Sequence, residues 1–296
     1  MRVLVSGGNG LVGSALTARL RWDGVAVGGL VRGAPGGPDE VRWDPGGGGA
    51  DSGALSGWDA VVHLAGKNVG TLWTPGAKRA IRESRVTGTR GLARAIARAK
   101  PAPSTLICAS AIGYYGSRGD ERLPEDATPG AGFLADVCVD WEAACDPARE
   151  AGVRTAHLRT GIVLAADDGP LSKMLLPFRL GLGGRMGDGS QWMSWVTLED
   201  TVEAIVFTLR ESSVSGPVNV VAPEPVTNAE FTRTLGAALG RPTPFPVPAF
   251  ALRLLPGGFG EETLLASQRA VPARLTGHGF TFRQPRLDQA LRSVLE

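Results

Sequence analysis

The chain has 296 residues, of which 43% are hydrophobic, enough to bury the core of one large α/β domain, alone or with a small second lobe. Its net charge of +2 gives no electrostatic case for a nucleic acid or an anionic membrane as partner. The three cysteines show no paired or metal-binding spacing, and no apolar run of about 18 residues occurs. We therefore expect a cytoplasmic protein.

The N-terminal residues combine a strand, a glycine turn and a helix. The apolar run 3–5 predicts a buried strand, and apolar residues at helical spacing over 11–20 predict a helix. Between them, Gly7 allows a tight turn, Gly10 lets a pyrophosphate approach the backbone, and Gly13 lets the helix pack closely. The free N–H groups at the start of the helix favour phosphate. The dinucleotide-binding residues predicted here are Gly7, Gly10, Leu11, Val12 and Gly13.

The second strand, predicted over 25–31, indicates which cofactor is preferred. An NAD site usually has an acidic residue at the end of this strand for the ribose 2′-hydroxyl, but here Arg32 follows. Arg32 could pair with a 2′-phosphate, so the sequence favours NADP over NAD; a solvated strand-end charge is the alternative. The segment 33–57, with GGGG at 46–49, predicts a loop with a short ordered piece at 43–45.

Residues 59–66 predict a third parallel strand that ends in small residues. Ala65 and Gly66, with Leu64 before them, would let the cofactor cross the strand end. His63 is predicted to be a core or strand-end residue rather than a catalyst.

A long helix is predicted over 78–99. On its polar face, Ser84 and Arg85 either face the nucleotide or belong to a solvated surface, and we include Ser84 in the predicted cofactor site. This helix and another predicted over 133–150 could pair between subunits, so a homodimer stays open.

A fourth strand is predicted over 104–110, and polar residues follow it. Ligands of open parallel sheets bind at the carboxyl ends of strands. Ser110 could orient a carbonyl or hydroxyl group there, and Tyr114 or Tyr115 could donate a proton. The alternative for the tyrosines is a buried phenol that hydrogen-bonds the loop.

The second half of the chain continues the alternation of strands and helices. A glycine-rich stretch at 183–195, with Arg185, Gln191, Trp192 and Trp195, predicts a loop that faces substrate or cofactor. The other predicted elements are a strand over 154–164, a helix from 197, a strand over 217–221, a helix opened by a capping box at 227–230, a helical segment near 249–255 and a terminal helix over 287–295.

Motifs along nearly the whole chain resemble the extended and atypical short-chain dehydrogenases/reductases, in particular the branch labelled NAD-dependent epimerase/dehydratase or epimerase family protein. They are GGNGLVG at 7–13, HLAGKNV at 63–69, SRVTGT at 84–89, SAIGYYG at 110–116, GGRMGDGSQWMSW at 183–195, GPVNVVAPEPV at 216–226 and SQRAVPARLTGHGFTF at 267–282.

The resemblance implies an α/β fold with a Rossmann-type doubly wound parallel sheet and a smaller C-terminal α/β substrate lobe. We expect 1–165, with 196–225 returning to it, to form the cofactor domain, and 166–195 with 226–296 to form the lobe. It also implies a nicotinamide cofactor, which we expect to be NADP, and a small-molecule substrate that it does not identify.

The sequence departs from the superfamily at the residues that move protons. The superfamily uses a Tyr and a Lys four residues later, and the Lys lowers the pKa of the Tyr. Four residues after the two adjacent tyrosines stand Arg118 and Gly119. The third partner, a Ser or Thr, falls at Ser110 or Ala111, depending on a shift of one residue.

The helix that should carry the pair offers no replacement. Counting back from Glu142 places Cys138 and Leu134 at the two positions, and counting from Phe133 gives Val137. Two functions follow from this departure: an NADP-dependent oxidoreductase or epimerase acting on a small, sugar-like hydroxyl or carbonyl compound, or a non-catalytic NADP-binding sensor or scaffold.

Overall fold

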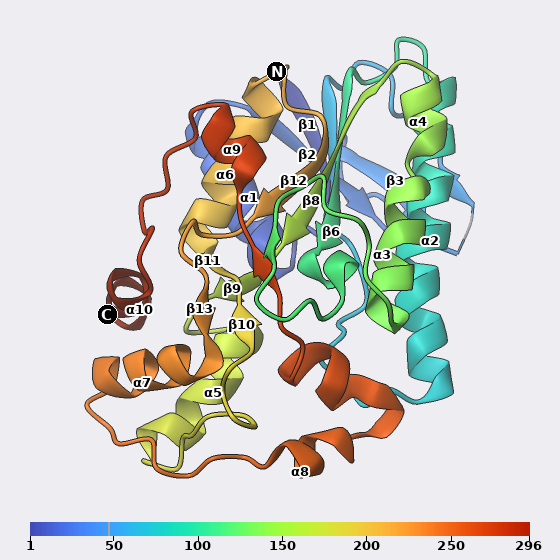
Figure 1. Cartoon of the computed structure of the whole chain (residues 1–296). Coiled ribbons are helices and arrows are strands. Elements are labelled where there is room, and N and C mark those ends of the chain that lie inside the picture. Colours follow the sequence, from blue (N-terminus) through green and yellow to red (C-terminus); the bar gives the residue numbers. More distant parts are fainter. Residues whose placement is uncertain (47) are drawn as a thin grey trace.

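The computed structural model describes residues 1–46 and 48–296, and an eight-stranded sheet lies at its centre (Figure 1). The strand order is β12-β8-β6-β5-β1-β2-β3-β4, and every pairing is parallel except that of β4 with β3. The strands are β1 Arg2–Ser6, β2 Ala26–Val31, β3 Glu40–Asp44, β4 Gly49–Ala50, β5 Ala60–His63, β6 Thr105–Ala111, β8 Arg154–Thr160 and β12 Gly216–Val220. The predicted Rossmann-type doubly wound sheet is confirmed.

The strand order reverses between β1 and β5. β1 pairs with β2 on one side and with β5 on the other, and Val5 lies between Gly29 and Val62. In open α/β sheets a crevice forms at such a reversal, outside the carboxyl ends of the strands. The cofactor motif after β1 therefore opens at the position where dinucleotides bind in this architecture.

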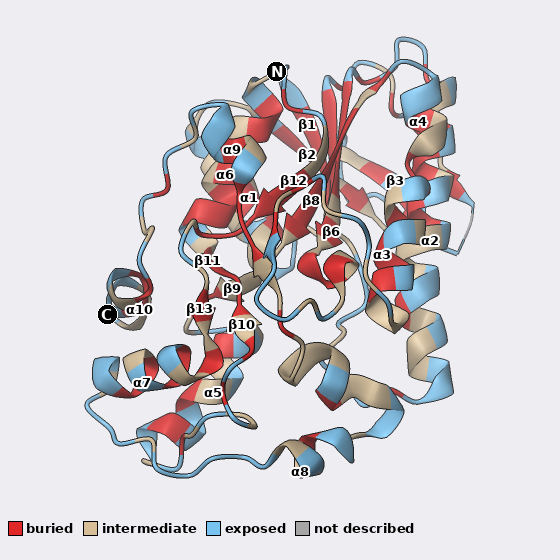
Figure 2. Ribbon diagram, in the orientation of Figure 1, coloured by how far each residue is buried: buried red, intermediate tan, exposed pale blue. Residues whose placement is uncertain are grey.

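Helices cover both faces of the sheet (Figure 1). One face carries α1 Leu11–Trp22 and α6 Leu198–Arg210, and the other carries α2 Pro75–Arg98, α3 Phe133–Ala143 and α4 Asp146–Glu150. Figure 2 shows buried residues along the strands and exposed residues on the outer sides of the helices. No helix in the described parts of the chain is long and apolar enough to cross a membrane.

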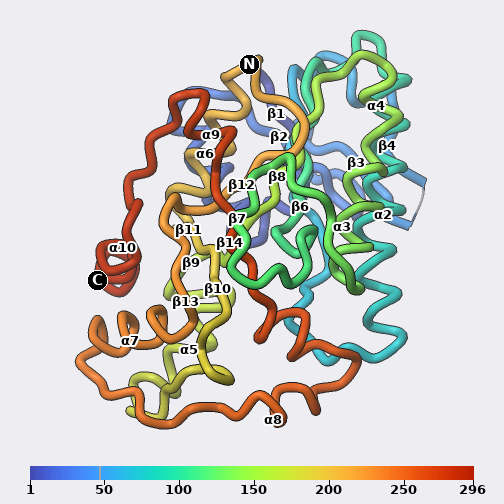
Figure 3. The backbone as a smooth tube through the Cα atoms, in the orientation of Figure 1, coloured from blue at the N-terminus to red at the C-terminus, as the bar shows by residue number. Residues whose placement is uncertain are grey.

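Most of the remaining elements lie beyond the carboxyl ends of the strands. A separate hydrophobic cluster, which includes Leu175, Phe178, Phe231 and Leu291, forms the core between α5, α7 and α10. Leu275 of α9 belongs instead to the core on the face of the sheet that carries α1 and α6. Figure 3 shows β7 beside β14, two short strands from distant parts of the chain that pair in parallel. The helices are α5 Gly169–Arg179, α7 Asn228–Ala238, α8 Ala249–Arg253, α9 Ala273–Gly277 and α10 Leu287–Leu295; the short strands are β7 Arg122–Leu123, β9 Ile162–Leu164, β10 Trp192–Met193, β11 Trp195–Thr197, β13 Val226–Thr227 and β14 Arg269–Ala270; short helical turns occur at Ile112–Tyr115, Pro256–Gly258 and Gly260–Leu264. The division into two domains stays a prediction.

The prediction of a loop over 33–57 is wrong in part. β3 extends the sheet beyond β2, and β4 pairs back onto it. Val41 and Trp43 are buried in the core formed with α2, which stabilises this strand despite its glycine-rich surroundings. Gly47, within the predicted loop, lies outside the described residues.

Three other predicted elements differ in their bounds. The helix predicted over 78–99 begins earlier, because Thr74 caps it and Pro75 occupies its first position. The helix predicted over 133–150 is divided into α3 and α4. The strand predicted over 154–164 is divided at Gly161, where a Cβ would lie 2.5 Å from the carbonyl oxygen of Ser194.

Candidate functional site

The glycine turn after β1 has the geometry that a dinucleotide site needs. Gly7 has a φ of +71°, which favours glycine, and the Gly10 amide donates to its carbonyl at 2.9 Å. A Cβ on Gly13 would lie 2.1 Å from the same carbonyl oxygen, so only glycine lets α1 begin this close to the turn. The N-terminus of α1 therefore opens beside the carboxyl end of β1, where a pyrophosphate can approach the backbone.

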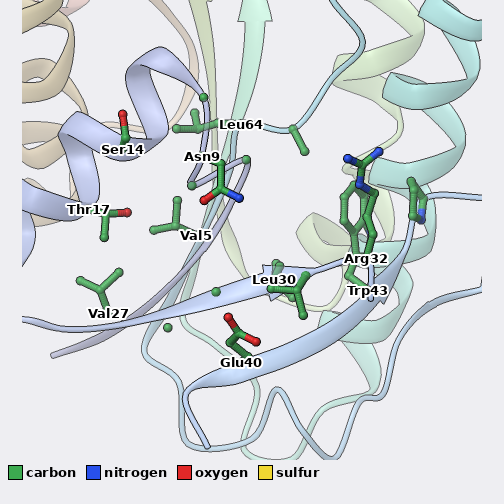
Figure 4. Close-up of a pocket in the computed structure, with 18 of the residues that line it drawn as sticks. Val5, Asn9, Ser14, Thr17, Val27, Leu30, Arg32, Glu40, Trp43 and Leu64 are labelled. Atoms are coloured by element: carbon green, nitrogen blue, oxygen red, sulfur yellow. The ribbon is translucent and has the colours of Figure 1, made fainter. Parts of the chain in front are cut away.

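A groove of about 1280 Å³ runs from this turn across β2 and β5 (Figure 4). Seven of the predicted cofactor residues line it: Gly7, Gly10, Arg32, Leu64, Ala65, Gly66 and Ser84. The other three, Leu11, Val12 and Gly13, do not line the groove. They form the first turn of α1, so they shape the start of the helix rather than the wall of the groove.

At one end of the groove, Arg32 follows β2 with an exposed side chain. Glu40, at the start of β3, is an acidic residue that lines the same groove. Its carboxylate accepts a hydrogen bond from the Gly36 amide at 2.6 Å, which ties it to its own loop. The charge directly at the end of β2 is therefore positive.

The end of β5 is held by a buried hydrogen-bond network. The Ser6 hydroxyl accepts from the amides of Leu64 and Ala65 at 3.1 and 3.2 Å and bonds to Nδ1 of His63 at 2.6 Å. His63 is fully buried, and desolvation lowers its pKa to about 4. His63 is therefore a neutral core residue, as predicted.

The polar face of α2 folds against this strand end. The Ser84 hydroxyl accepts from the Lys67 amide at 3.1 Å and donates to the Ile81 carbonyl at 3.0 Å. Arg85 donates to the Lys67 carbonyl at 2.8 Å, and its guanidinium lies 4.9 Å from the centre of the Trp141 ring. These side chains are therefore tied to the segment after β5 rather than freely solvated, and contact of this face with the nucleotide stays a prediction.

Ser110, at the end of β6, points to an ion pair that the sequence did not reveal. Its hydroxyl donates to Glu142 Oε1 at 2.8 Å. The same carboxylate binds Arg159 of β8 through two hydrogen bonds of 2.8 Å. Although burial acts in the opposite direction, these bonds and the charge of Glu142 raise the pKa of Arg159 above its usual value. Ser110 is therefore oriented by the Glu142 side chain, which Arg159 in turn holds.

The two tyrosines have different surroundings. Tyr115 is fully buried, its hydroxyl donates to Asn219 Oδ1 at 2.7 Å, and Arg159 donates to it at 3.1 Å. Burial raises the pKa of Tyr115 to about 12. These contacts favour the alternative of a structural tyrosine that holds the loop. The ring of Tyr114 lies 3.4 Å from the Arg159 guanidinium, is partly exposed, and remains the candidate proton donor.

The side of α3 that faces the turn 112–115 carries no proton-transfer pair. An added Cβ at Gly113 would lie 3.3 Å from Cβ of Leu134 and 3.9 Å from Sγ of Cys138. Burial raises the pKa of Cys138 to about 12, so its thiol stays protonated. The two positions counted back from Glu142 therefore hold an apolar side chain and an unreactive thiol.

The glycine-rich stretch 183–195 lines a different cavity, of about 510 Å³. Gln191 and Trp192 contribute to its wall, and the Arg269 guanidinium lies 4.0 Å from the Trp192 ring. Trp195 is fully buried, and its indole donates to the Glu224 carbonyl at 3.1 Å. This part of the predicted substrate-facing loop is therefore packed into the core.

The chain is similar to known proteins over its whole length. Residues 3–222 match the model of the NAD dependent epimerase/dehydratase family, and residues 247–294 match a domain of unknown function, DUF1731. Epimerase family protein MT2273 of Mycobacterium tuberculosis is 46% identical over 290 residues, which are 98% of this chain and 96% of that protein.

Solved structures agree with this similarity. The crystal structure of human epimerase family protein SDR39U1 with NADPH superposes with a TM-score of 0.89 at 34% identity, covering 99% of each chain. A protein from Corynebacterium glutamicum described as a nucleoside-diphosphate sugar epimerase gives a TM-score of 0.83 at 39% identity, covering all of this chain and 58% of that one. The chain belongs to the NAD dependent epimerase/dehydratase family, within the short-chain dehydrogenase/reductase superfamily.

Proposed function

We propose that the protein is an NADP-dependent oxidoreductase or epimerase. The observation that carries this proposal is the groove that joins the turn at Gly7 and Gly10 to Arg32. The turn fits a pyrophosphate, and an arginine at the end of β2, with no acidic residue there, fits a 2′-phosphate. The human relative crystallised with NADPH supports the same cofactor.

The bound cofactor would supply or accept a hydride, and the chain's own residues would position the reacting groups. Ala65 and Gly66 leave room at the end of β5, and Ser110 and Tyr114 follow from β6. Tyr114 would exchange a proton with a hydroxyl or carbonyl oxygen, while Glu142 holds the Ser110 hydroxyl in one orientation. The description of the Corynebacterium relative supports a sugar-like substrate.

A second candidate function is a non-catalytic NADP-binding sensor or scaffold. It is favoured by Leu134 and Cys138, because neither residue can lower the pKa of a tyrosine as a nearby cation would.

The two functions are separated by following the hydride. The purified protein is mixed with NADPH deuterated at C4, with each face labelled in a separate sample, and with a metabolite extract of the host cell. Label that appears in one metabolite establishes an oxidoreductase and identifies its substrate. An epimerase must first accept a hydride from its substrate, so a parallel sample contains NADP+ in place of NADPH; a metabolite whose stereochemistry changes there without net formation of NADPH establishes an epimerase that returns its hydride. Bound NADPH with every metabolite unchanged supports the sensor, and absence of NADPH binding overturns both.

A further inference from the structure

Most of the exposed large hydrophobic side chains lie along one edge of the protein. Eleven such side chains occur among residues 1–46 and 48–296, and seven of them belong to the segments 169–187 and 240–260. We call these two segments, which contain α5 and α8, the α5–α8 edge, and Figure 1 shows them at the lower side of the molecule. Single exposed apolar residues are ordinary, whereas a contiguous group of them marks a site of interaction.

Backbone hydrogen bonds hold the two segments of the edge side by side. The Val247 amide donates to the Arg185 carbonyl at 2.8 Å, and the Gly187 amide donates to the Val247 carbonyl at 2.8 Å. The two segments run in parallel at this point. Leu182 and Phe245, which precede these bonds on the two segments, therefore lie on neighbouring stretches of chain, and both side chains are exposed.

Each helix of the edge exposes an apolar stripe. Leu176 and Leu180 are four positions apart on α5 and at its end, and Phe250 and Leu254 have the same spacing on α8 and at its end. Residues at this spacing lie on one side of a helix. All four side chains are between 64% and 78% exposed, whereas Leu252 is buried and anchors α8 to the protein. The stripes are therefore open to solvent, and packing in the core does not explain them.

All charged residues of the edge have the same sign. The segments 169–187 and 240–260 contain no aspartate or glutamate. Their five cations are exposed, and none of them forms an ion pair in the parts of the chain that the structure describes. The net charge of the whole chain does not reveal this concentration, because the remaining residues together are net negative. The five cations are Lys173, Arg179, Arg185, Arg241 and Arg253.

An anionic lipid bilayer matches both properties of the edge. Apolar side chains enter the boundary between headgroups and acyl chains, and cations are attracted to anionic headgroups. A second copy of the chain matches less well. A symmetric dimer through this edge would bring two sets of the same five cations together, and like charges across an interface disfavour association.

We propose that the α5–α8 edge is a docking surface that binds anionic phospholipid bilayers. The exposed apolar side chains insert at the level of the headgroups, and the five cations contact the lipid phosphates. This inference goes beyond the proposed function and does not depend on it. Ala249 and Arg253 of α8 also line the cavity of about 510 Å³, so docking brings this cavity to the membrane surface.

Co-sedimentation of the full chain with lipid vesicles tests the proposal. The vesicles are phosphatidylcholine alone or an equal mixture of phosphatidylcholine and phosphatidylglycerol, each at low and at high salt. One double variant of the edge, Phe250→Ser with Leu254→Ser, removes exposed apolar side chains. The other, Arg179→Gln with Arg185→Gln, removes two charges. Analytical ultracentrifugation without vesicles gives the oligomeric state of each protein.

The controls are matched substitutions away from the edge. Trp22→Ser removes an 88% exposed apolar side chain on α1. Arg90→Gln with Arg94→Gln removes two exposed charges on α2. All of the changed side chains are exposed, so the variants should fold like the wild type, and thermal unfolding checks this.

We expect the wild-type chain at low salt to bind the anionic vesicles about tenfold or more tightly than the neutral vesicles, because each cation near an anionic surface adds to the attraction. High salt should weaken this binding. Each double variant of the edge should lower the partition coefficient on anionic vesicles about tenfold or more, and the controls should leave it unchanged.

A wild-type chain that sediments with neither kind of vesicle would overturn the proposal. Equal weakening by the edge and control variants would also overturn it, because such a result is typical of non-specific adsorption. A wild-type dimer that Phe250→Ser with Leu254→Ser converts to a monomer, with vesicle binding unchanged, would assign the edge to a contact between copies of the chain instead.

Discussion

Arg159 on β8 and Glu142 on α3 form a bidentate ion pair inside the protein, with two N–O distances of 2.8 Å. Their side chains are only 3% and 13% exposed, so each charge depends on the other for its stabilisation. The pair joins the sheet to the helix, and it also contacts Ser110 on β6 and Tyr115 in the loop after it. The buried polar groups at this end of the sheet are therefore one connected network.

Replacing Glu142 should destabilise the protein strongly. Glu142→Gln keeps the volume but leaves the Arg159 charge buried without its partner, and we expect the free energy of unfolding to fall by about 3–5 kcal/mol. Urea unfolding measures the change. Glu121→Gln, which removes the partner of Arg118 in an exposed pair, is the control and should cost at most about 1 kcal/mol. Similar decreases in the free energy of unfolding in both variants would show that burial does not increase the contribution of the Glu142–Arg159 pair.

Replacing Arg32 should change cofactor preference. Arg32→Gln removes the charge at the end of β2, so we expect NADPH binding to weaken about tenfold or more while NADH binding changes little. Fluorescence titration with the two cofactors gives the ratio of dissociation constants. Arg42→Gln, an exposed position on β3 outside the groove, should leave both values unchanged. An unchanged NADPH affinity in Arg32→Gln would instead support the solvated strand-end charge.

Replacing the two tyrosines should affect different properties, stability for Tyr115 and turnover for Tyr114. Tyr115→Phe removes a buried hydroxyl and leaves Asn219 Oδ1 without its donor, so the free energy of unfolding should fall by about 1–3 kcal/mol. Tyr114→Phe should leave stability nearly unchanged and reduce the rate of label transfer from deuterated NADPH. If Tyr114→Phe transfers label at the wild-type rate, Tyr114 is not the proton donor.

His63 should make stability depend on pH. Its pKa is about 4 in the folded protein, compared with 6.5 for the unperturbed side chain. Between these two pH values the unfolded chain binds more protons than the folded protein. The contribution of neutral His63 to the free energy of unfolding is therefore complete above pH 6.5 and is lost as the pH falls towards 4. We expect a loss of about 2 kcal/mol between pH 7 and pH 5.

The variant His63→Asn removes this titration while keeping a polar group near Ser6. Burial lowers the pKa of His157 as well, so only the difference between wild type and variant measures His63. Parallel stability curves for the two proteins over pH 5–7 would show that His63 does not titrate as expected.

The sequence predicts the parts of this molecule whose signals are local. β1, the glycine turn and α1 lie within the first 22 residues. The turn requires glycine at fixed positions, and these glycines are visible in the sequence itself. β3 is different. Its buried Val41 and Trp43 alternate with exposed residues, but only over five positions in a segment rich in glycine, proline and aspartate. Packing against α2 decides the outcome, and a short local pattern does not reveal that packing.

The interior of the site depends on contacts that are distant in sequence. Tyr115 and Asn219 are separated by 104 positions, and their hydrogen bond decides that this tyrosine is structural while its neighbour is partly exposed. Arg85 lies within the motif at 84–89, but its hydrogen bond to the Lys67 carbonyl and its approach to the Trp141 ring depend on segments that the fold brings to it. A spacing rule identifies residue types that can act together, whereas the fold decides which of their atoms are already occupied.

The late position of β12 in the chain has a consequence for protein synthesis. β12 covers the edge of β8 over five paired positions, and the Asn219 side chain donates to carbonyls of Leu123 and Val271. A nascent chain that has left the ribosome only as far as β8 therefore has a strand with one unpaired edge. Such an edge can pair with another chain, so β8 is the segment that a holdase chaperone would need to shield until β12 emerges.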